Sequence, residues 1–349
     1  MTKQNLMGLT LDQLQELFER MGEKSYRGRQ MFKWLYNNRR FDFDGMTDFS
    51  KQLRQNLEEH YTIRGLELAR RTVSADGTEK SLFRLEDDHP VESVLIPDDE
   101  RRTVCISSQA GCALACRFCA TGTMGLLRDL TVGEIVGQLV YLRELHGADC
   151  FTNVVFMGMG EPLNNYQNLV ASLRIMTDSL GLGIGAKKIT VSTSGVTPKI
   201  KKLADTGLKT RLAISLHAAT QEKRVKVMPI AETFGLEKLM QAIRYYTDAT
   251  GYRVTFEYVL LEGFNDTKKD VLALSRLIEG IPCKINLLAY NPVPGLPYRR
   301  PSEDKVNWFA RELYPRAPAV TVRKSRGQDI DAACGQLAAK TSTQATETR

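Results

Sequence analysis

The sequence predicts an α/β protein in which a parallel sheet curls into a complete or partial barrel. The first observation behind this prediction is that apolar, β-branched segments alternate with helix-like segments from about residue 103 onward. The second is that short motifs of glycine and polar residues stand where the apolar segments stop. Barrels of this kind carry their chemistry at the C-terminal ends of the strands, so these motifs mark the expected site.

The N-terminal part predicts three short helices, at about 9–22, 27–39 and 46–58, because apolar residues recur there at helical spacing. Six basic residues and no acidic ones lie between Lys24 and Arg40. Since basic side chains neutralise phosphates, we interpret residues 1–65 as a helical RNA-binding accessory domain, with a merely solvated basic face as the alternative.

Aromatic residues are interleaved with these basic residues. Exposed aromatic rings can stack on bases, but burial in the core of an amphipathic helix is the preferred interpretation. The aromatic residues are Tyr26, Phe32, Trp34 and Tyr36.

Residues 66–100 predict a β-rich extension that precedes the barrel. Asp76-Gly77 is a hairpin-turn pair, residues 80–85 alternate between apolar and polar, and residues 91–97 are rich in β-branched side chains.

The catalytic core is expected at residues 101–338, with helices such as 131–145 and 168–180 between the strands. The polar segment 339–349 has no periodicity and is expected to be disordered. The expected strands are 103–108, 153–159, 187–195, 208–217, 253–261, 284–291 and 319–324.

The composition agrees with a soluble cytoplasmic enzyme. Hydrophobic residues make up 42% and charged residues 26% of the 349 residues. Neither a signal peptide nor an apolar run of ~18 residues is visible, so no membrane association is expected. Seven cysteines are too few for a disulfide scaffold and indicate metal chemistry in a reducing compartment. The net charge of +7 permits a polyanionic partner.

Three cysteines stand close together at Cys112, Cys116 and Cys119. Three thiolates can hold three irons of a cubic iron–sulfur cluster and leave the fourth iron open for a small molecule, whereas electron-transfer clusters take four protein ligands. A structural zinc site is the alternative, but it needs four closed ligands. The chain offers no second cysteine pair and only four histidines, so the cluster is favoured.

The motifs at the strand ends predict a ligand site. Gly160 and Glu161 follow one apolar strand, and glycine lets backbone approach a ligand closely while the carboxylate can accept hydrogen bonds from an ammonium group. Further polar residues stand at the ends of other predicted strands, although each alone could be an ordinary loop residue. They are Ser192, Ser215, His217 and Asn291.

The triplet with Phe118 resembles the cluster loop of the radical S-adenosylmethionine (SAM) superfamily. The runs SSQAGC, FMGMGEP, STSG, SLHA and DIDAACGQL, in this order over about residues 90 to 338, resemble the RlmN/Cfr family of radical SAM RNA methyltransferases. The stretch VRKSRG is more similar to the RlmN branch than to the Cfr branch. The resemblance implies a partial (β/α)6-type TIM barrel core with a small N-terminal helical accessory domain.

The resemblance also assigns roles to individual residues. Cys112, Cys116 and Cys119 would bind one 4Fe–4S cluster, shielded by Phe118. The expected SAM contacts are Gly160, Glu161, Ser192, Ser215, Leu216, His217 and Asn291.

Two further cysteines and a glutamate complete the chemistry that the resemblance implies. One SAM would methylate Cys334, and a radical from a second SAM would activate that methyl group for addition to adenine. Cys105 would then attack the sulfur of Cys334 and release the RNA, while Glu92 accepts the ring proton. Without the resemblance, both thiols are more simply inert buried cysteines and Glu92 a surface residue.

The remaining cysteines, Cys150 and Cys283, match no functional position and are expected to be structural.

The function implied is methylation of adenosine C2 in 23S rRNA and tRNA, by a monomer that receives electrons from a flavodoxin or ferredoxin. Three alternatives stay open: Cfr-type methylation at C8, a radical SAM activase, and a non-catalytic iron–sulfur RNA-binding protein. The activase leaves Cys334 and Cys105 without a role, and the non-catalytic protein leaves the SAM motifs without one.

Overall fold

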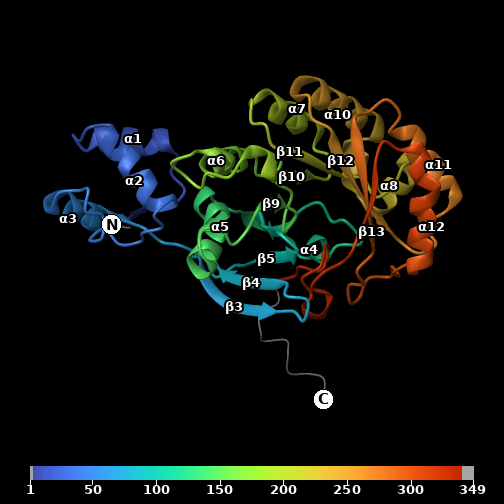
Figure 1. The fold of residues 1–349 in the computed structure, drawn as a ribbon, viewed down its shortest axis with the longest axis horizontal. Coiled ribbons are helices and arrows are strands. Elements are labelled where there is room, and N and C mark those ends of the chain that lie inside the picture. The colour runs from blue at the N-terminus through green and yellow to red at the C-terminus, as the bar shows by residue number, and fades with distance from the viewer. Residues whose placement is uncertain (1–2, 340–349) are drawn as a thin grey trace, which may run out of the picture.

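The computed structural model describes residues 3–339 of the chain (Figure 1). Within these residues, ten strands form one sheet, in the order β14-β13-β12-β11-β10-β9-β6-β5-β4-β3. The two outer strands of this order, β14 and β3, are not paired with each other, so the sheet stays open. The prediction of a partial barrel is confirmed.

Each of the seven predicted barrel strands is present, and the pairings among these seven are all parallel. Six of them, β6 to β13, form the (β/α)6-type core, and β14 adds a further parallel strand at the edge. The four residues of β9 are all buried, as expected for a parallel strand covered on both faces. The strands are β6 (Arg101–Cys105), β9 (Asn153–Phe156), β10 (Ile189–Thr193), β11 (Arg211–Ser215), β12 (Val254–Leu260), β13 (Cys283–Ala289) and β14 (Val320–Arg323).

Helices connect these strands and cover the outside of the sheet (Figure 1). The helix α5 starts with a capping box, in which the Thr131 hydroxyl accepts from the backbone of Glu134 and the Glu134 side chain accepts from the backbone of Thr131. The helices are α5 (Val132–His146), α6 (Tyr166–Thr177), α7 (Thr197–Asp205), α8 (Gln221–Val227), α9 (Ile230–Thr233), α10 (Leu236–Thr250), α11 (Lys268–Leu277) and α12 (Glu303–Leu313).

Three antiparallel strands, β3 (Glu67–Val73), β4 (Glu79–Arg84) and β5 (Pro90–Asp98), extend the sheet beside β6. The predicted hairpin turn joins β3 to β4, and Asp76 stabilises it by accepting a hydrogen bond from the backbone of Thr78. Because Val94 of β5 pairs with Cys105 of β6, Glu92 lies on the strand next to Cys105.

Three helices, α1 (Leu11–Arg20), α2 (Tyr26–Tyr36) and α3 (Lys51–His60), lie at one end of the molecule (Figure 1). The short strands β1 (Gln4–Asn5) and β2 (Tyr61–Thr62) pair in parallel and join the start of this segment to its end. The third helix starts at Lys51 and not near Met46 as predicted, because the Ser50 hydroxyl caps it by accepting from the backbone of Leu53.

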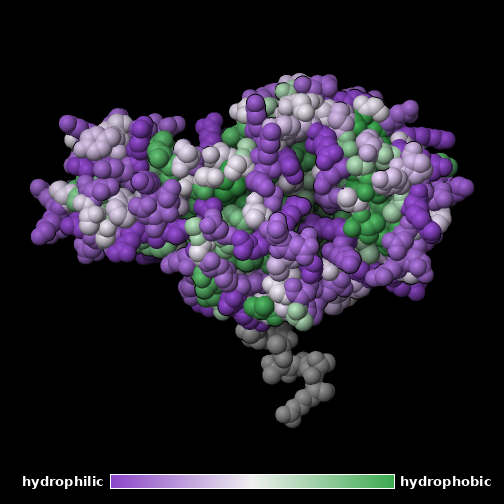
Figure 2. Space-filling model, viewed as in Figure 1, coloured by the Kyte–Doolittle hydropathy of each residue, from purple (hydrophilic) through white to green (hydrophobic). Residues whose placement is uncertain are grey.

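The core prediction for the aromatic residues of α2 holds for most of them. Phe32 and Tyr36 are buried, and the Tyr36 hydroxyl donates to the carbonyl of Leu9. Trp34 is half-buried against the same core, whereas Tyr26 is 49% exposed and was wrongly included. The surface of this end is mainly hydrophilic (Figure 2), and its contact with RNA stays a prediction.

No helix in residues 3–339 is long and apolar enough to cross a membrane. Of the segment 339–349, which was expected to be disordered, only Ala339 lies within the described residues.

Candidate active site

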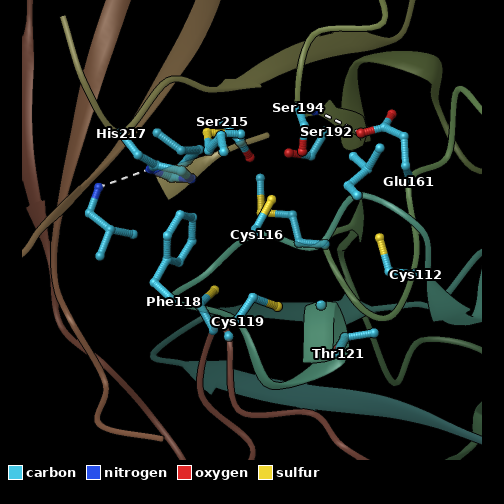
Figure 3. Close-up of a pocket in the computed structure, with 18 of the residues that line it drawn as sticks. Cys112, Cys116, Phe118, Cys119, Thr121, Glu161, Ser192, Ser194, Ser215 and His217 are labelled. Atoms are coloured by element: carbon cyan, nitrogen blue, oxygen red, sulfur yellow. Dashed lines mark hydrogen bonds between the residues drawn. The ribbon is translucent and has the colours of Figure 1, made fainter. Parts of the chain in front are cut away.

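One pocket opens at the C-terminal ends of the barrel strands, where the sequence placed the site (Figure 3). It brings together nearly all of the predicted residues, and Figure 3 shows Cys119 across the cavity from Ser192 and Ser215. Leu216 is the exception among the expected SAM contacts, because its side chain is fully buried and does not line the pocket. The predicted residues that line it are Cys112, Cys116, Cys119, Gly160, Glu161, Ser192, Ser215, His217, Asn291 and Cys334.

Cys112 is the last residue of the strand β7 (Gln109–Cys112), and Cys116 and Cys119 lie on the loop between β7 and the short helix α4 (Ala120–Thr123). The strand β8 (Gly125–Asp129) returns beside β7 as a hairpin. Close packing holds this loop: a side chain at Gly122 would place its Cβ 2.8 Å from the carbonyl of Cys116. Phe118 packs its ring edge-on against His217 with the centroids 4.9 Å apart, which closes one side of the pocket.

The thiols in this pocket fit an iron–sulfur cluster. Burial raises the pKa of Cys112 to about 12, and burial followed by the charge of Cys119 raises the pKa of Cys116. Three neighbouring thiolates are therefore stable here only with a bound cationic group. Among residues 3–339, no group of three or more His, Cys, Asp or Glu side chains is arranged so that it could hold a metal ion. Three thiolates on one loop suit a cluster, in which each binds a different iron, whereas a structural zinc ion needs four closed ligands.

Gly158 and Gly160 have a packing role that the sequence did not predict. A Cβ at Gly160, where φ is +94°, would lie 2.5 Å from the Cβ of Gln109, and one at Gly158 would lie 2.6 Å from the Ser107 hydroxyl. Both glycines therefore let the end of β9 pack against the segment before the cluster loop. They also line the pocket, so the close approach to a ligand stays possible.

We expect Gly160→Ala to lower the free energy of unfolding by about 2–4 kcal/mol, because it adds both backbone strain and a steric clash. Gly183→Ala is the matched control, since Gly183 has φ +63° but no atom within 4 Å of its Cβ position. Gly183→Ala should lower the free energy of unfolding by only about 1–2 kcal/mol. Urea titration of the two variants measures the difference, and equal values would disprove the clash.

Glu161 joins the ends of two strands. Its buried carboxylate accepts hydrogen bonds from the backbone of Ser194 at 2.7 Å and of Leu163 at 3.1 Å. Burial raises its pKa, while these donors oppose the rise. The side chains of Thr193 and Ser194 also hydrogen-bond to this carboxylate. Glu161 lines the pocket, and an ammonium group bound there would compete with these hydroxyls for its oxygens.

His217 presents a defined tautomer to the pocket. Its Nδ1 accepts a hydrogen bond of 3.1 Å from the backbone of Val259, so the ring proton resides on Nε2. Burial lowers the pKa of His217 to about 3, which keeps the ring neutral. Its backbone has φ +55°, and Asn265 holds this conformation by donating to its carbonyl. The neutral ring can therefore act as a hydrogen-bond donor through Nε2.

Cys334 is exposed at the pocket, and the surrounding residues fix its backbone. The Asn291 amide donates to the carbonyl of Cys334 at 3.1 Å, and Arg300 holds the Asn291 oxygen at 3.1 Å. The next carbonyl, that of Gly335, accepts from the backbone of Ala120 at 2.7 Å. The cluster loop and the Cys334 segment are therefore directly joined.

Cys105 is buried and does not line the pocket, but it lies within electrostatic reach of Cys334. Burial, followed by the charge of Cys334, raises the pKa of Cys105 to about 12, whereas Arg323 lowers it. The sequence did not single out Arg323, although a basic residue that ends an apolar strand is the same signal that marked the other strand ends.

Glu92 is buried, so it is not the surface residue that the alternative expected. Its carboxylate lies 3.2 Å from the ammonium group of Lys80. It also accepts hydrogen bonds from the backbones of Ala338 and Ala339 at 3.1 and 3.0 Å. Glu92 thus lines a second pocket next to the Cys334 segment and not the cluster pocket itself. The partner Lys80 was missed because an alternating strand gives no sign of which residue it faces.

Comparison with known proteins shows similarity along nearly the whole chain. Residues 4–63 match the family described as Ribosomal RNA large subunit methyltransferase N-terminal domain, and residues 106–275 match the Radical SAM superfamily. The chain is 44% identical to the probable dual-specificity RNA methyltransferase RlmN of Christiangramia forsetii, over 97% of both chains. It is 46% identical to RlmN of Anaeromyxobacter sp., over 96% of this chain and 91% of that protein.

A solved structure is similar over the same extent. It is a radical SAM methyltransferase from Sphaerobacter thermophilus, 44% identical in sequence, with a TM-score of 0.92. The superposition covers 97% of this chain and all of that one.

Proposed function

This chain belongs to the RlmN family of radical SAM RNA methyltransferases, and we propose that it methylates C2 of adenosine in 23S rRNA and tRNA. The proposed positions are an adenosine of the peptidyl transferase centre and adenosine 37 of tRNA. Family membership implies SAM and a 4Fe–4S cluster. We assign the cluster to Cys112, Cys116 and Cys119, and two SAM molecules to each turnover.

The chemistry of the target explains why the protein must carry the methyl group. C2 of adenine is an sp² carbon without a lone pair, so it does not attack the electrophilic methyl group of SAM. Cys334 can do so through its thiolate and become S-methylated. When bound, the cluster would supply the electron that cleaves a second SAM to a 5′-deoxyadenosyl radical. The S-methyl group of Cys334 then loses a hydrogen atom and bonds to the adenine ring.

Cys105 and Glu92 complete the turnover. Glu92 accepts the ring proton, and the radical adduct gives up one electron, which a bound cluster could take back. The thiolate of Cys105 then attacks the sulfur of Cys334, which forms a disulfide and releases the RNA, whose methylene group takes up a proton to become methyl. An external reductant must break this disulfide before the next turnover. Because Ala338 and Ala339 occupy one oxygen of Glu92, we propose that the end of the Cys334 segment moves when RNA binds.

The observation that supports this function most strongly is the position of Cys334. An exposed thiol outside the cluster triplet shares one pocket with all three triplet cysteines and with the strand-end residues proposed to bind SAM. A radical SAM activase or a non-catalytic iron–sulfur protein has no use for a thiol there.

We also propose that the N-terminal helices grip the RNA and that the target adenine leaves its stack to reach the pocket. The protein would act as a monomer and receive electrons from a flavodoxin or ferredoxin.

The decisive experiment is anaerobic reconstitution with iron, sulfide, SAM and reductant, followed by incubation with protein-free rRNA or tRNA. We expect 2-methyladenosine on nucleoside mass spectrometry, together with 5′-deoxyadenosine. Exclusive 8-methyladenosine would show Cfr-type activity instead, and RNA binding without 5′-deoxyadenosine would show a non-catalytic protein.

A further inference from the structure

Arg224 on α8 is the largest fully buried side chain in the described part of the molecule, and it lies behind the pocket. Its Nε donates to the carbonyl of Leu216 at 3.2 Å. Its Nη2 donates to the carbonyl of Ser194 at 2.6 Å and to that of Ser215 at 3.3 Å.

These carbonyls belong to the ends of β10 and β11, where Ser192 and His217 enter the pocket. One guanidinium therefore links two adjacent strand ends that no strand hydrogen bond holds beyond Thr193 and Ile214. Its planar fork suits this task, since several N–H groups leave it in fixed directions.

The charge of Arg224 is not compensated within the described residues. None of their carboxylates forms an ion pair with it, and its Nη1 is buried without a hydrogen-bond partner there. Burial lowers the pKa of Arg224 to about 10, so the side chain is still a cation at neutral pH. A buried cation without an anion is unfavourable by several kcal/mol, and it indicates that negative charge is missing from this region.

The neighbouring cluster loop can supply this negative charge. Arg224 lies on α8 (Gln221–Val227), next to the loop that carries Cys116 and Cys119. The same helix contacts the loop directly, since the carbonyl of Val227 accepts from the backbone of Arg117 at 2.9 Å. A 4Fe–4S cluster with three thiolates carries a net negative charge, which increases by one unit on reduction.

We propose that Arg224 is a positioning residue that clamps the ends of β10 and β11 around SAM and balances the negative charge of the thiolate-bound cluster. The inference rests on the proposed cluster and SAM site, but not on the position that is methylated. It follows that the positive charge stabilises the reduced cluster, because cluster potentials depend on nearby charge and hydrogen bonds.

Two variants separate the clamp from the charge. Arg224→Met removes both, so we expect a more negative midpoint potential of the reconstituted cluster and SAM affinity weakened about 10- to 100-fold. Arg224→Lys keeps the charge but not the three-carbonyl clamp, so its potential should stay close to that of the wild type while SAM binding weakens. Potentiometric EPR titration and equilibrium dialysis with SAM measure the two effects without RNA or turnover.

Arg143→Met is the matched control. Arg143 is partly buried, with an unpaired Nε, but its Nη1 donates to the carbonyl of Leu182 and not to a strand end at the pocket. Arg143→Met should therefore keep the midpoint potential and the SAM affinity of the wild type. An unchanged potential in Arg224→Met would overturn the proposal.

If Arg224→Met takes up no iron, Arg224→Lys decides: a wild-type potential with weak SAM binding supports the proposal, and a shifted potential overturns it. A wild-type protein that binds no iron would instead refute the proposed function.

Discussion

Cys334→Ala is expected to abolish RNA methylation, with a loss on the order of 10³-fold or more, as when an essential nucleophile is removed. Cys334 is the exposed thiol of the pocket, and without it no sulfur can receive the first methyl group. Because Cys334 is not one of the three proposed cluster ligands, the variant should still bind iron and cleave SAM. Nucleoside mass spectrometry measures the methylated RNA, and 5′-deoxyadenosine reports SAM cleavage in the same reaction.

The matched control for this variant is Cys283→Ala. Cys283 is a buried thiol in β13, 2% exposed, and it does not line the pocket. Its loss should leave methylation nearly unchanged. Full methylation by Cys334→Ala would rule out the protein-borne methyl group and leave direct transfer from SAM.

Cys105→Ala is expected to stop the reaction at a different stage. Cys334 can still be methylated and can still bond to RNA, but no thiolate is available to attack its sulfur. A covalent complex of RNA and protein should therefore accumulate, in place of turnover, and remain intact on a denaturing gel. The double variant Cys105→Ala/Cys334→Ala should form none, which shows that the bond runs through Cys334.

The pH dependence of release provides an independent check in the wild-type protein. The pKa of Cys105 is raised to about 12, mainly by burial. Since the thiolate is the attacking form, its fraction rises with pH over the whole range below 12, and so should the rate of RNA release. Single-turnover quenching at several pH values measures this rate. Release by Cys105→Ala at the wild-type rate would show that another group resolves the complex.

Much of the fold could be predicted because its signals are local. The seven parallel strands are apolar, β-branched segments of the kind that sheets buried on both faces require. The start of α3 was misplaced because the apolar residues Met46 and Phe49 resemble a helical stripe, although Ser50 begins the helix after them. Tyr26 was misjudged for the same reason, since spacing alone does not say which face of the first turn is covered.

Without the family resemblance, which supplied Cys334, Cys105 and Glu92, the site was predictable only where residues are close in sequence or stop a strand. The cysteine triplet meets the first condition and Ser192 or His217 the second. The ion pair of Lys80 with Glu92 meets neither, because it depends on how β4 and β5 align and on where the C-terminal segment returns. Arg224 was missed because a basic residue in a short helix gives no sign that its side chain is buried.

The attachment of the Cys334 segment has a consequence for how far the methyl group can be carried. Glu92 anchors this segment at Ala338, four residues after Cys334, and Ser74 anchors it at Asp329, five residues before. A fully extended chain of four residues spans at most about 14 Å. While both anchors hold, the sulfur of Cys334 can therefore move only a short distance. It can reach neighbouring reactants in the pocket, but it cannot reach RNA at the surface. Asn291 and Ala120 also hold the carbonyls of Cys334 and Gly335, so Cys334 stays in place when Ala338 and Ala339 leave Glu92. The adenine must therefore enter the pocket.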